Sequence, residues 1–341
     1  MVPCLGSLLL LALWPVAQEP QPAAERVQPT AIDLGEVRVG AVVETSAAIF
    51  WGRPPGDVQV EVELPKDLRP LSQRTYVREQ DKAVTDLGFA VPTHETGHFE
   101  RTIPVRRGDE QVAIPVSWTV APASPGGSRI LVADSPFEAY STDDPATFAV
   151  WRALVATNRF DVDYRYTRKN VRAFTAEALA RVDVVLVGES SLRDISQGDV
   201  DRLQGFVCGG GRVVLCANSF FVGTVPAANR VCEPFGLEMV DRESRSPGAV
   251  GDVHRDPLTV GVEGVSAGTR SPTRITDGDL ARSLVDLPIL GGADPFVAYA
   301  RTQSGGEVIT IGAALWWDWI SEAPGNARLL RNLLVRPPRM R

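Results

Sequence analysis

The sequence predicts two domains: an all-β sandwich, followed by an α/β domain with a doubly wound parallel sheet. Apolar residues recur with period two from Val27 to Val120, and strand-like and helix-like segments alternate from residue 129 onward. Residues 122–128 lie between these patterns and are rich in Pro, Gly and Ser, as in a linker. A chain of 341 residues with 44% hydrophobic content is long enough to bury two cores.

The first domain is expected over residues 27–121. Apolar side chains alternate with polar ones from Val58 to Leu64 and again from Val112 to Val120. Gly and Pro residues interrupt the pattern at the spacing of sandwich turns, which predicts seven strands. Pro115 falls inside one of these strands and indicates an edge position or a bulge.

The second domain is expected over residues 129–341. Its predicted strands are RILVAD, FDVDYRY, DVVLVG, RVVLC and GEVITIG. The helices between and after them begin near Asp144, Thr175, Ser196 or Asp199, and Asn326. The triple glycine at 209–211 follows a helix and precedes a strand, so it predicts a helix end and not a phosphate-binding loop.

The amino end predicts export. An apolar run from Leu8 to Trp14 is followed by the small residue Ala17, which fits a signal peptide over residues 1–17, although no Lys or Arg precedes the run. The run is too short to span a bilayer. We therefore expect a periplasmic or extracellular protein with no transmembrane span in the mature chain.

The charge of the chain limits the classes of partner that it is expected to bind. The formal net charge is −7 and no basic block occurs, which argues against nucleic acid and anionic membranes. Without the signal segment three cysteines remain, Cys208, Cys216 and Cys232. A Cys216–Cys232 disulfide is conceivable, but we favour three buried thiols.

One sequence motif matches the metal-binding motif of zinc proteases. Residues 94–98 match H-E-x-x-H, in which a helix places both histidines on one face. Pro92 precedes the motif and Gly97 lies inside it, so we expect a turn between strands, with His94 and His98 exposed. No metal and no cofactor are predicted.

Polar residues follow the predicted parallel strands, where ligands of such sheets bind. They are Asp134, Ser135, Glu189, Ser190, Asn218, Ser219, Trp316, Trp317 and Asp318. Carboxylates, amides and indoles suit a polar ligand such as a carbohydrate. The alternative is that the tryptophans pack the last helix or the domain interface.

Two resemblances add to this interpretation. The segment TAIDLGEVRVGAVVETSAAIF resembles exported bacterial Ig-like domains, over residues 27–122, and implies a packing or tethering module. The segments FVCGGGRVVLCANSFF, NRVCEPFGLEM, VHRDPLTVGV and GGEVITIGAALWWDWI resemble the class I glutamine-amidotransferase-like superfamily over residues 129–341. The similarity is to its non-amidotransferase branch, which includes trehalose-utilisation-like and intraflagellar-transport-like domains, and it implies a flavodoxin-like sheet.

Active members of this superfamily use a cysteine at a glycine-rich elbow and a distant His-x-Glu pair. Cys216 lies near the elbow position but is followed by Ala217-Asn218-Ser219, and no His-x-Glu follows. Cys216, His254 and Glu189 are therefore weak catalytic candidates, and a Cys216–His254 dyad lacks a residue to orient the base.

We expect a binding or scaffold protein of the cell envelope, a pseudoenzyme that recognises an unidentified envelope protein or polar ligand. One alternative is a hydrolase or isomerase that acts on a carbohydrate or amide with Glu189, Asp134 or Cys216. Another is a structural module of a larger membrane assembly.

Overall fold

The computed structural model describes most of the chain after the predicted signal peptide. The described residues are 27–28, 30–51, 59–78, 82–122, 127–133, 160–165, 173–242, 244–245, 251–289, 292–313 and 323–336. The predicted signal segment and the helix expected near Asp144 lie outside them. No helix among these residues is long and apolar enough to cross a membrane.

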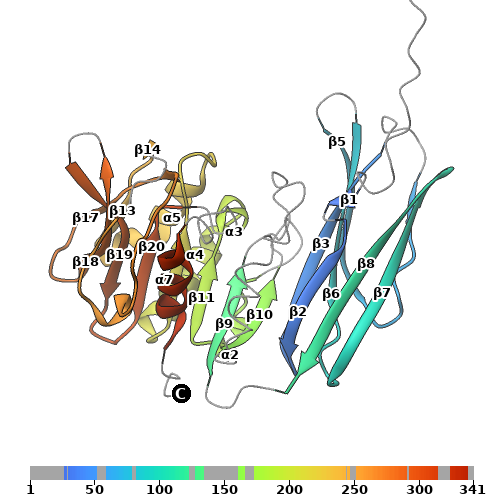
Figure 1. The fold of residues 1–341 in the computed structure, drawn as a ribbon, viewed down its shortest axis with the longest axis horizontal. Helices are drawn as coiled ribbons and strands as arrows, with labels where there is room; N and C mark the ends of the chain where they lie inside the picture. Colours follow the sequence, from blue (N-terminus) through green and yellow to red (C-terminus); the bar gives the residue numbers. More distant parts are fainter. Residues whose placement is uncertain are drawn as a thin grey trace, which may run out of the picture.

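The first part of the chain is β-rich, as the sequence predicted (Figure 1). Strands β2, β8, β7 and β4 form one sheet, and β1, β3, β6 and β5 form one end of a 12-stranded sheet that continues into the second part of the chain. Their bounds are Val27–Gln28 (β1), Ile32–Arg38 (β2), Val43–Phe50 (β3), Val60–Val62 (β4), Arg69–Arg78 (β5), Lys82–Val91 (β6), Gly97–Arg107 (β7) and Glu110–Ala121 (β8). Eight strands are described instead of the seven predicted, because Val27 and Gln28 pair with β3.

Large apolar side chains from both of these sheets share one core. Trp51 and Trp118 are the largest fully buried side chains of the described residues. Each indole N–H is satisfied, by Thr85 Oγ1 at 2.8 Å for Trp51 and by the carbonyl of Pro92 at 3.0 Å for Trp118. The tryptophans therefore fill the core without leaving a buried donor unpaired.

β8 contains Pro115 although it is an interior strand of its sheet. β8 lies between β7 and β2, so it is not an edge strand. Its pairing with β2, however, begins at Val116, one residue after the proline. Pro115 therefore pairs with β7 alone, opposite Thr102, just before the pairing with β2 begins.

The second part contains five parallel strands in the order β10-β9-β11-β12-β20. Their bounds are Ser128–Ala133 (β9), Phe160–Arg165 (β10), Val184–Val187 (β11), Arg212–Cys216 (β12) and Glu307–Ile311 (β20). The five segments are the strands expected from the sequence. β11 and β12 are buried along their whole length, as in a sheet that is covered on both faces.

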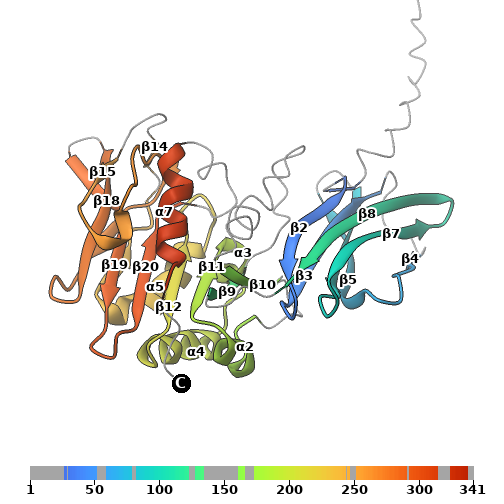
Figure 2. The ribbon, with the colours of Figure 1, turned by 60° about the horizontal axis from the view of Figure 1, so that its bottom comes forward.

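Helices cover this sheet on both faces (Figure 2). Apolar residues of α2, α4 and α5 share a core with Val185 and Val187, whereas those of α7 lie in the core that holds Val184 and Leu186. The helix bounds are Ala176–Arg181 (α2), Glu189–Arg193 (α3), Gln197–Cys208 (α4), Thr224–Cys232 (α5) and Pro324–Leu334 (α7). Ser196 caps α4 in a capping box with Asp199, so Ser196 is the residue that opens this helix.

Antiparallel strands, which the sequence did not predict, extend the sheet beyond β20. They are β15 (Asp252–Val253), β18 (Ala281–Ile289) and β19 (Gly292–Arg301), in the order β15-β18-β19-β20. Two small separate sheets pair β13 (Leu237–Met239) with β17 (Thr273–Ile275) and β14 (Ser244–Arg245) with β16 (Thr269–Arg270).

The two parts are joined through β10, which pairs with β9 on one side and with β3 on the other. One hydrogen bond between the parts adds to this contact: Arg181 of α2 donates to the carbonyl of Gly40 at 3.1 Å. The sequence had predicted a β-sandwich and an α/β domain separated by a linker, without a shared sheet. β6 pairs with the whole length of β3, so the other edge of β3 is left for β1, which pairs at Ala48 and Ile49, and for β10, which pairs at Val43.

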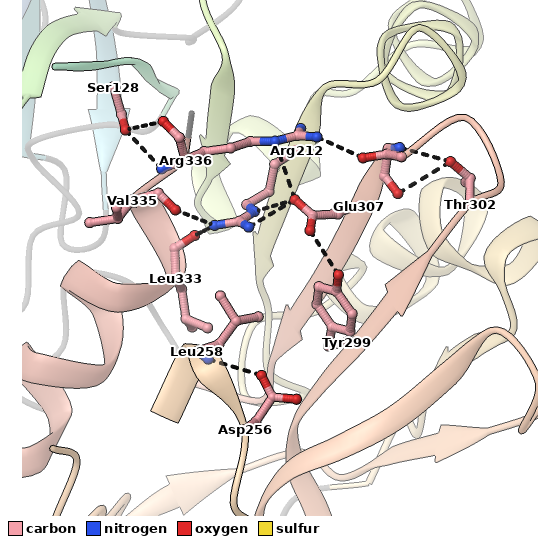
Figure 3. A network of polar contacts seen from close by, with 12 residues as sticks. Ser128, Arg212, Asp256, Leu258, Tyr299, Thr302, Glu307, Leu333, Val335 and Arg336 are labelled. Atoms are coloured by element: carbon pink, nitrogen blue, oxygen red, sulfur yellow. Dashed lines mark hydrogen bonds and ion pairs between the residues drawn. The ribbon is translucent and has the colours of Figure 1, made fainter. Parts of the chain in front are cut away.

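A buried polar network holds the end of α7 at the amino edge of the parallel sheet (Figure 3). Arg212 donates to Glu307 at 2.8 Å and to the carbonyls of Leu333 and Val335 at 2.6 and 2.9 Å. Tyr299 donates its hydroxyl proton to Glu307 at 2.7 Å. The network therefore satisfies carbonyls that the last turn of α7 leaves without partners.

This network predicts an acid-sensitive stability. Burial alone would raise the pKa of Glu307, but the hydrogen bond and charge of Arg212 outweigh it, so the pKa lies below its ordinary value. A lowered carboxylate pKa adds stability above the pKa of the unfolded chain, and this stability is lost as pH falls through the folded value. Urea unfolding from pH 7 to pH 3 should show stability falling below about pH 4 more steeply in the wild type than in Glu307→Gln. Equal slopes would contradict this assignment.

Candidate functional site

Four of the predicted ligand residues lie at the carboxyl edge of the parallel sheet. Glu189 and Ser190 follow β11, and Asn218 and Ser219 follow β12. The two strands are in register, with Val187 opposite Leu215, so both loops leave the sheet at the same level. The other predicted residues, Asp134, Ser135, Trp316, Trp317 and Asp318, lie outside the described residues.

Glu189 and Ser190 are covered and do not face solvent. Glu189 is the first residue of the short helix α3 and is fully buried, and Ser190 is 3% exposed. The neighbouring Ser191 donates to the carbonyl of Ala133 at 2.5 Å, which holds α3 against the end of β9. A ligand at this edge would meet the surface of the loops before it met the Glu189 carboxylate.

The backbone N–H groups of Ala217 and Ser219, after β12, form hydrogen bonds within the protein. The N–H of Ala217 donates to the carbonyl of Ile311 at 3.2 Å, which continues the pairing with β20 by one residue. The N–H of Ser219 donates to Ser271 Oγ at 2.9 Å, and the two hydroxyl groups are 3.1 Å apart. Neither N–H is available to an incoming group.

Asn218 accepts further hydrogen bonds within the same loop. Its side-chain Oδ1 accepts the N–H of Phe220 at 2.7 Å, and its carbonyl accepts the N–H of Phe221 at 3.1 Å and the hydroxyl of Thr224 at 2.9 Å. Asn218 is 1% exposed. The side chain that the sequence offered as a ligand contact therefore holds the loop in shape, because an Asx turn uses its oxygen locally.

The exposed part of this loop is apolar. Phe220 is 40% exposed and Val222 is 90% exposed, whereas Phe221 is buried beneath the guanidinium of Arg193, which lies 5.4 Å from its ring centre. Phe220 and Val222 were not among the residues predicted to bind a ligand. The sequence feature that could have indicated them is a pair of apolar residues in a loop directly after a buried strand.

Cys216 is inside the sheet and not at an elbow. It is the last residue of β12, lies opposite Ile311 and is fully buried in the core shared with α7. An elbow nucleophile has to follow its strand and point out of the edge. Cys216 does neither.

Cys216 and His254 do not form the dyad that was weighed as a catalytic alternative. Cys216, Ile311, Val297, Val285 and Val253 stand in one row across five strands. His254 follows Val253, so four strand spacings of about 4.8 Å, or about 19 Å, separate it from Cys216. The two residues lie at opposite ends of this row, too far apart for a hydrogen bond between their side chains.

His254 does have a carboxylate beside it, which the sequence did not reveal. Its Nε2 lies 2.7 Å from Asp286 Oδ2, and Ser283 donates to the other oxygen of Asp286 at 2.5 Å. The serine therefore contacts the carboxylate and not the imidazole. A serine nucleophile needs a direct hydrogen bond to its base, so these three residues do not form a catalytic triad.

The H-E-x-x-H segment is a turn that leads into a strand, as predicted. His94 lies in the bend before β7, and His98 is the second residue of β7. Their side chains are 74% and 59% exposed. No group of three metal-binding side chains occurs among the described residues.

The expectation of three buried thiols is wrong for one of them. Cys208 ends α4 and is exposed, whereas Cys216 and Cys232 are buried, and none of the three is in a disulfide. Burial raises the pKa of Cys232 to about 12. Cys208 falls on the outward side of α4, where Val200, Leu203, Phe206 and Val207 take the buried positions.

Comparison with known proteins gives no family. No family model matches the chain, and no curated protein matches it. Similar solved structures include a family 123 glycoside hydrolase from Clostridium perfringens, which is 9% identical with a TM-score of 0.23 and covers 61% of this chain and 45% of that one.

Two further structures are an endo-fucoidan hydrolase of glycoside hydrolase family 107 and the amylomaltase of Corynebacterium glutamicum. They are 8% and 13% identical, with TM-scores of 0.18 and 0.17. The matches cover 30% and 46% of this chain and 14% and 21% of those chains. This chain therefore spans less than half the length of each of the three proteins, and TM-scores this low carry no argument.

Proposed function

We propose that this protein is an exported, non-catalytic binding or scaffold protein of the bacterial cell envelope. In this proposal an Ig-like domain is joined to a flavodoxin-like, degenerate domain of the class I glutamine-amidotransferase-like superfamily. The strand order β10-β9-β11-β12-β20 supports the flavodoxin-like assignment, since it is the order 2-1-3-4-5 of that fold.

One observation carries the proposal of a non-catalytic domain. The N–H groups of Ala217, Ser219, Phe220 and Phe221, which follow β12, all donate within the protein. Acyl-transfer chemistry at this position needs free N–H donors for the developing oxyanion and a nucleophile at the turn. Here the donors are occupied, and Cys216 lies in the core.

The alternative of a hydrolase or isomerase needs two titratable groups that converge on one substrate. Of its three named candidates, Glu189 lies at the carboxyl edge but is buried, Cys216 lies in the core, and Asp134 is outside the described residues. No observation favours this alternative over binding.

Thiol labelling tests the non-catalytic assignment. Iodoacetamide applied to the folded protein at neutral pH should label the exposed Cys208 and leave Cys216 unlabelled, because a buried thiol is inaccessible and only the thiolate reacts. Peptide mass spectrometry measures both sites in one sample, so Cys208 is the internal control. Cys216 labelled as fast as Cys208 would overturn the assignment.

Binding can be tested at the apolar tip of the loop after β12. Val222→Asp should abolish co-purification of the envelope partner while the Tm stays unchanged, because Val222 is 90% exposed and packs against little. Quantitative mass spectrometry of proteins captured from native envelope extract measures this. Val260→Asp is the matched control, since Val260 is 63% exposed but lies beyond η5 (Pro257–Thr259). Equal loss of capture in both variants would contradict a site at the strand edge.

A further inference from the structure

The outer face of α7 is basic. The leucines of this helix are buried in the core beneath it, and Figures 1 and 2 show α7 in front of the sheet, on the outside of the molecule. Arg328 and Arg331 fall on the side of the helix that faces away from the core, where Arg328 is exposed and Arg331 is half-buried. Val335, the residue after the helix, is 45% exposed. We call Arg328 and Arg331 the basic face of α7.

The two guanidinium groups of the basic face are not neutralised. Neither Arg328 nor Arg331 forms an ion pair with another described residue. Arg331 donates to the carbonyl of Ala327, within its own helix, at 3.3 Å. The guanidinium of Arg328 lies beside Gly261, where an ideal Cβ would be 3.4 Å from Nη2. Both positive charges are therefore available to a partner of opposite charge.

The segment that packs beside α7 adds no net negative charge. It includes η5 and is held to the helix by a hydrogen bond from Asn332 to the carbonyl of Val260, at 2.9 Å. Asp256 of this segment is paired with Arg282 through hydrogen bonds of 2.8 and 2.6 Å. Its other two charged residues, Arg255 and Glu263, are both exposed and have opposite signs.

The last part of the sequence is basic as well. Residues 323–341 contain arginines at 328, 331, 336, 339 and 341 and no Asp or Glu. Arg336 belongs to the buried network with Glu307, but Arg339 and Arg341 follow it in the sequence. The net charge of −7 argued against anionic membranes for the chain as a whole. At a surface, however, only charges within about one Debye length act, which is about 8–10 Å in physiological salt.

We propose that the basic face of α7 docks on the headgroups of an anionic phospholipid bilayer. A guanidinium group pairs with phosphate through two parallel hydrogen bonds, and basic clusters on a helix attract anionic lipids. A protein partner would usually bury an aromatic or other large residue at the centre of its interface, and α7 contains no aromatic residue. The contact involves no residue of the loop after β12, so it does not depend on the proposed function.

Co-sedimentation of the full chain with vesicles tests the proposal. Phosphatidylcholine vesicles that contain about 30% phosphatidylglycerol should pellet the protein, and pure phosphatidylcholine vesicles should not. Arg328→Gln with Arg331→Gln should lower the partition coefficient by about tenfold or more, because each arginine near an anionic surface contributes roughly a factor of five. The matched control is Arg74→Gln with Arg106→Gln, which removes the same charge from exposed positions of β5 and β7 and should bind as the wild type does.

Salt and a second variant sharpen the test. Sodium chloride at about 0.5 M should release the protein, because the Debye length shortens to roughly 4 Å. Val222→Asp should still pellet with the anionic vesicles, so failure of the proposed function and failure of this proposal are distinguishable. No pelleting with anionic vesicles, equal pelleting with neutral ones, or equal loss in the two double variants would overturn the proposal. Binding to soluble polyglutamate but not to vesicles would also overturn it and would assign the basic face to an acidic protein.

Discussion

Arg212→Ala should lower the free energy of unfolding by about 3–5 kcal/mol, because it leaves the buried Glu307 carboxylate without its main partner. It also removes the donors to the carbonyls of Leu333 and Val335 at the end of α7. Arg336 remains within 3.3 Å of the carboxylate but is bound to Gly305 as well. Urea denaturation at pH 7 measures the loss.

A matched pair of variants separates the buried charge from the loss of packing. Arg212→Met with Glu307→Leu replaces the Arg212–Glu307 ion pair by an apolar pair of similar volume, which by itself costs little. We expect it to recover only part of the stability that Arg212→Ala loses, because Arg336, which also pairs with Glu307, is left without a carboxylate. Arg328→Gln should change stability by no more than about 0.5 kcal/mol, as an exposed substitution does. A loss below about 1 kcal/mol in Arg212→Ala would show that water reaches the network freely.

Gly312→Ala should destabilise the protein by about 2 kcal/mol or more, because the added methyl group meets a backbone oxygen that has no room to move. An ideal Cβ at Gly312 would lie 1.9 Å from the carbonyl oxygen of Ser271. Gly312 also accepts the N–H of Ser271 at 2.8 Å and donates to the carbonyl of Phe296 at 2.9 Å. Thermal unfolding followed by circular dichroism measures the effect.

The same substitution should disturb the candidate site. Ser271 holds Ser219, so a displaced Ser271 would open the loop after β12 and expose its N–H groups. Amide exchange at Ser219 should therefore rise in Gly312→Ala. Gly205→Ala is the control, because no atom lies within 4 Å of its ideal Cβ and alanine in the middle of α4 should stabilise by about 0.5–1 kcal/mol. Equal stability of the two variants would contradict the close approach at Gly312.

Local patterns were sufficient to predict the parallel strands and the starts of α2 and α4. The strands β9, β11, β12 and β20 consist mostly of apolar residues, which is typical of buried parallel strands. The capping residues Thr175 and Ser196 lie directly before α2 and α4, since a cap acts within one turn. The turn at His94 also followed from nearby residues, Pro92 and Gly97.

The antiparallel strands were missed because their pattern is irregular. The pairing of β18 with β19 shifts register between Ser283 and Asp286, which interrupts the period-two alternation. The segment also contains Pro288 and Pro295, which normally argue against a strand. The pairing partners, and not the local propensity, decide these strands.

By itself the sequence determined a β-rich first part, the five parallel strands and the edge at which the loops after β11 and β12 emerge. Only the tertiary structure decided what the residues at that edge do: it buries Glu189 and turns Asn218 inward to hold its own loop. It also places Cys216 four strands away from Val253, the residue before His254. The physical reason is the separation along the chain over which each interaction acts. Propensity and capping act over a few residues, whereas burial, hydrogen-bond partners and charge compensation depend on segments that are far apart in the chain, such as Ser219 with Ser271 and Arg212 with Glu307.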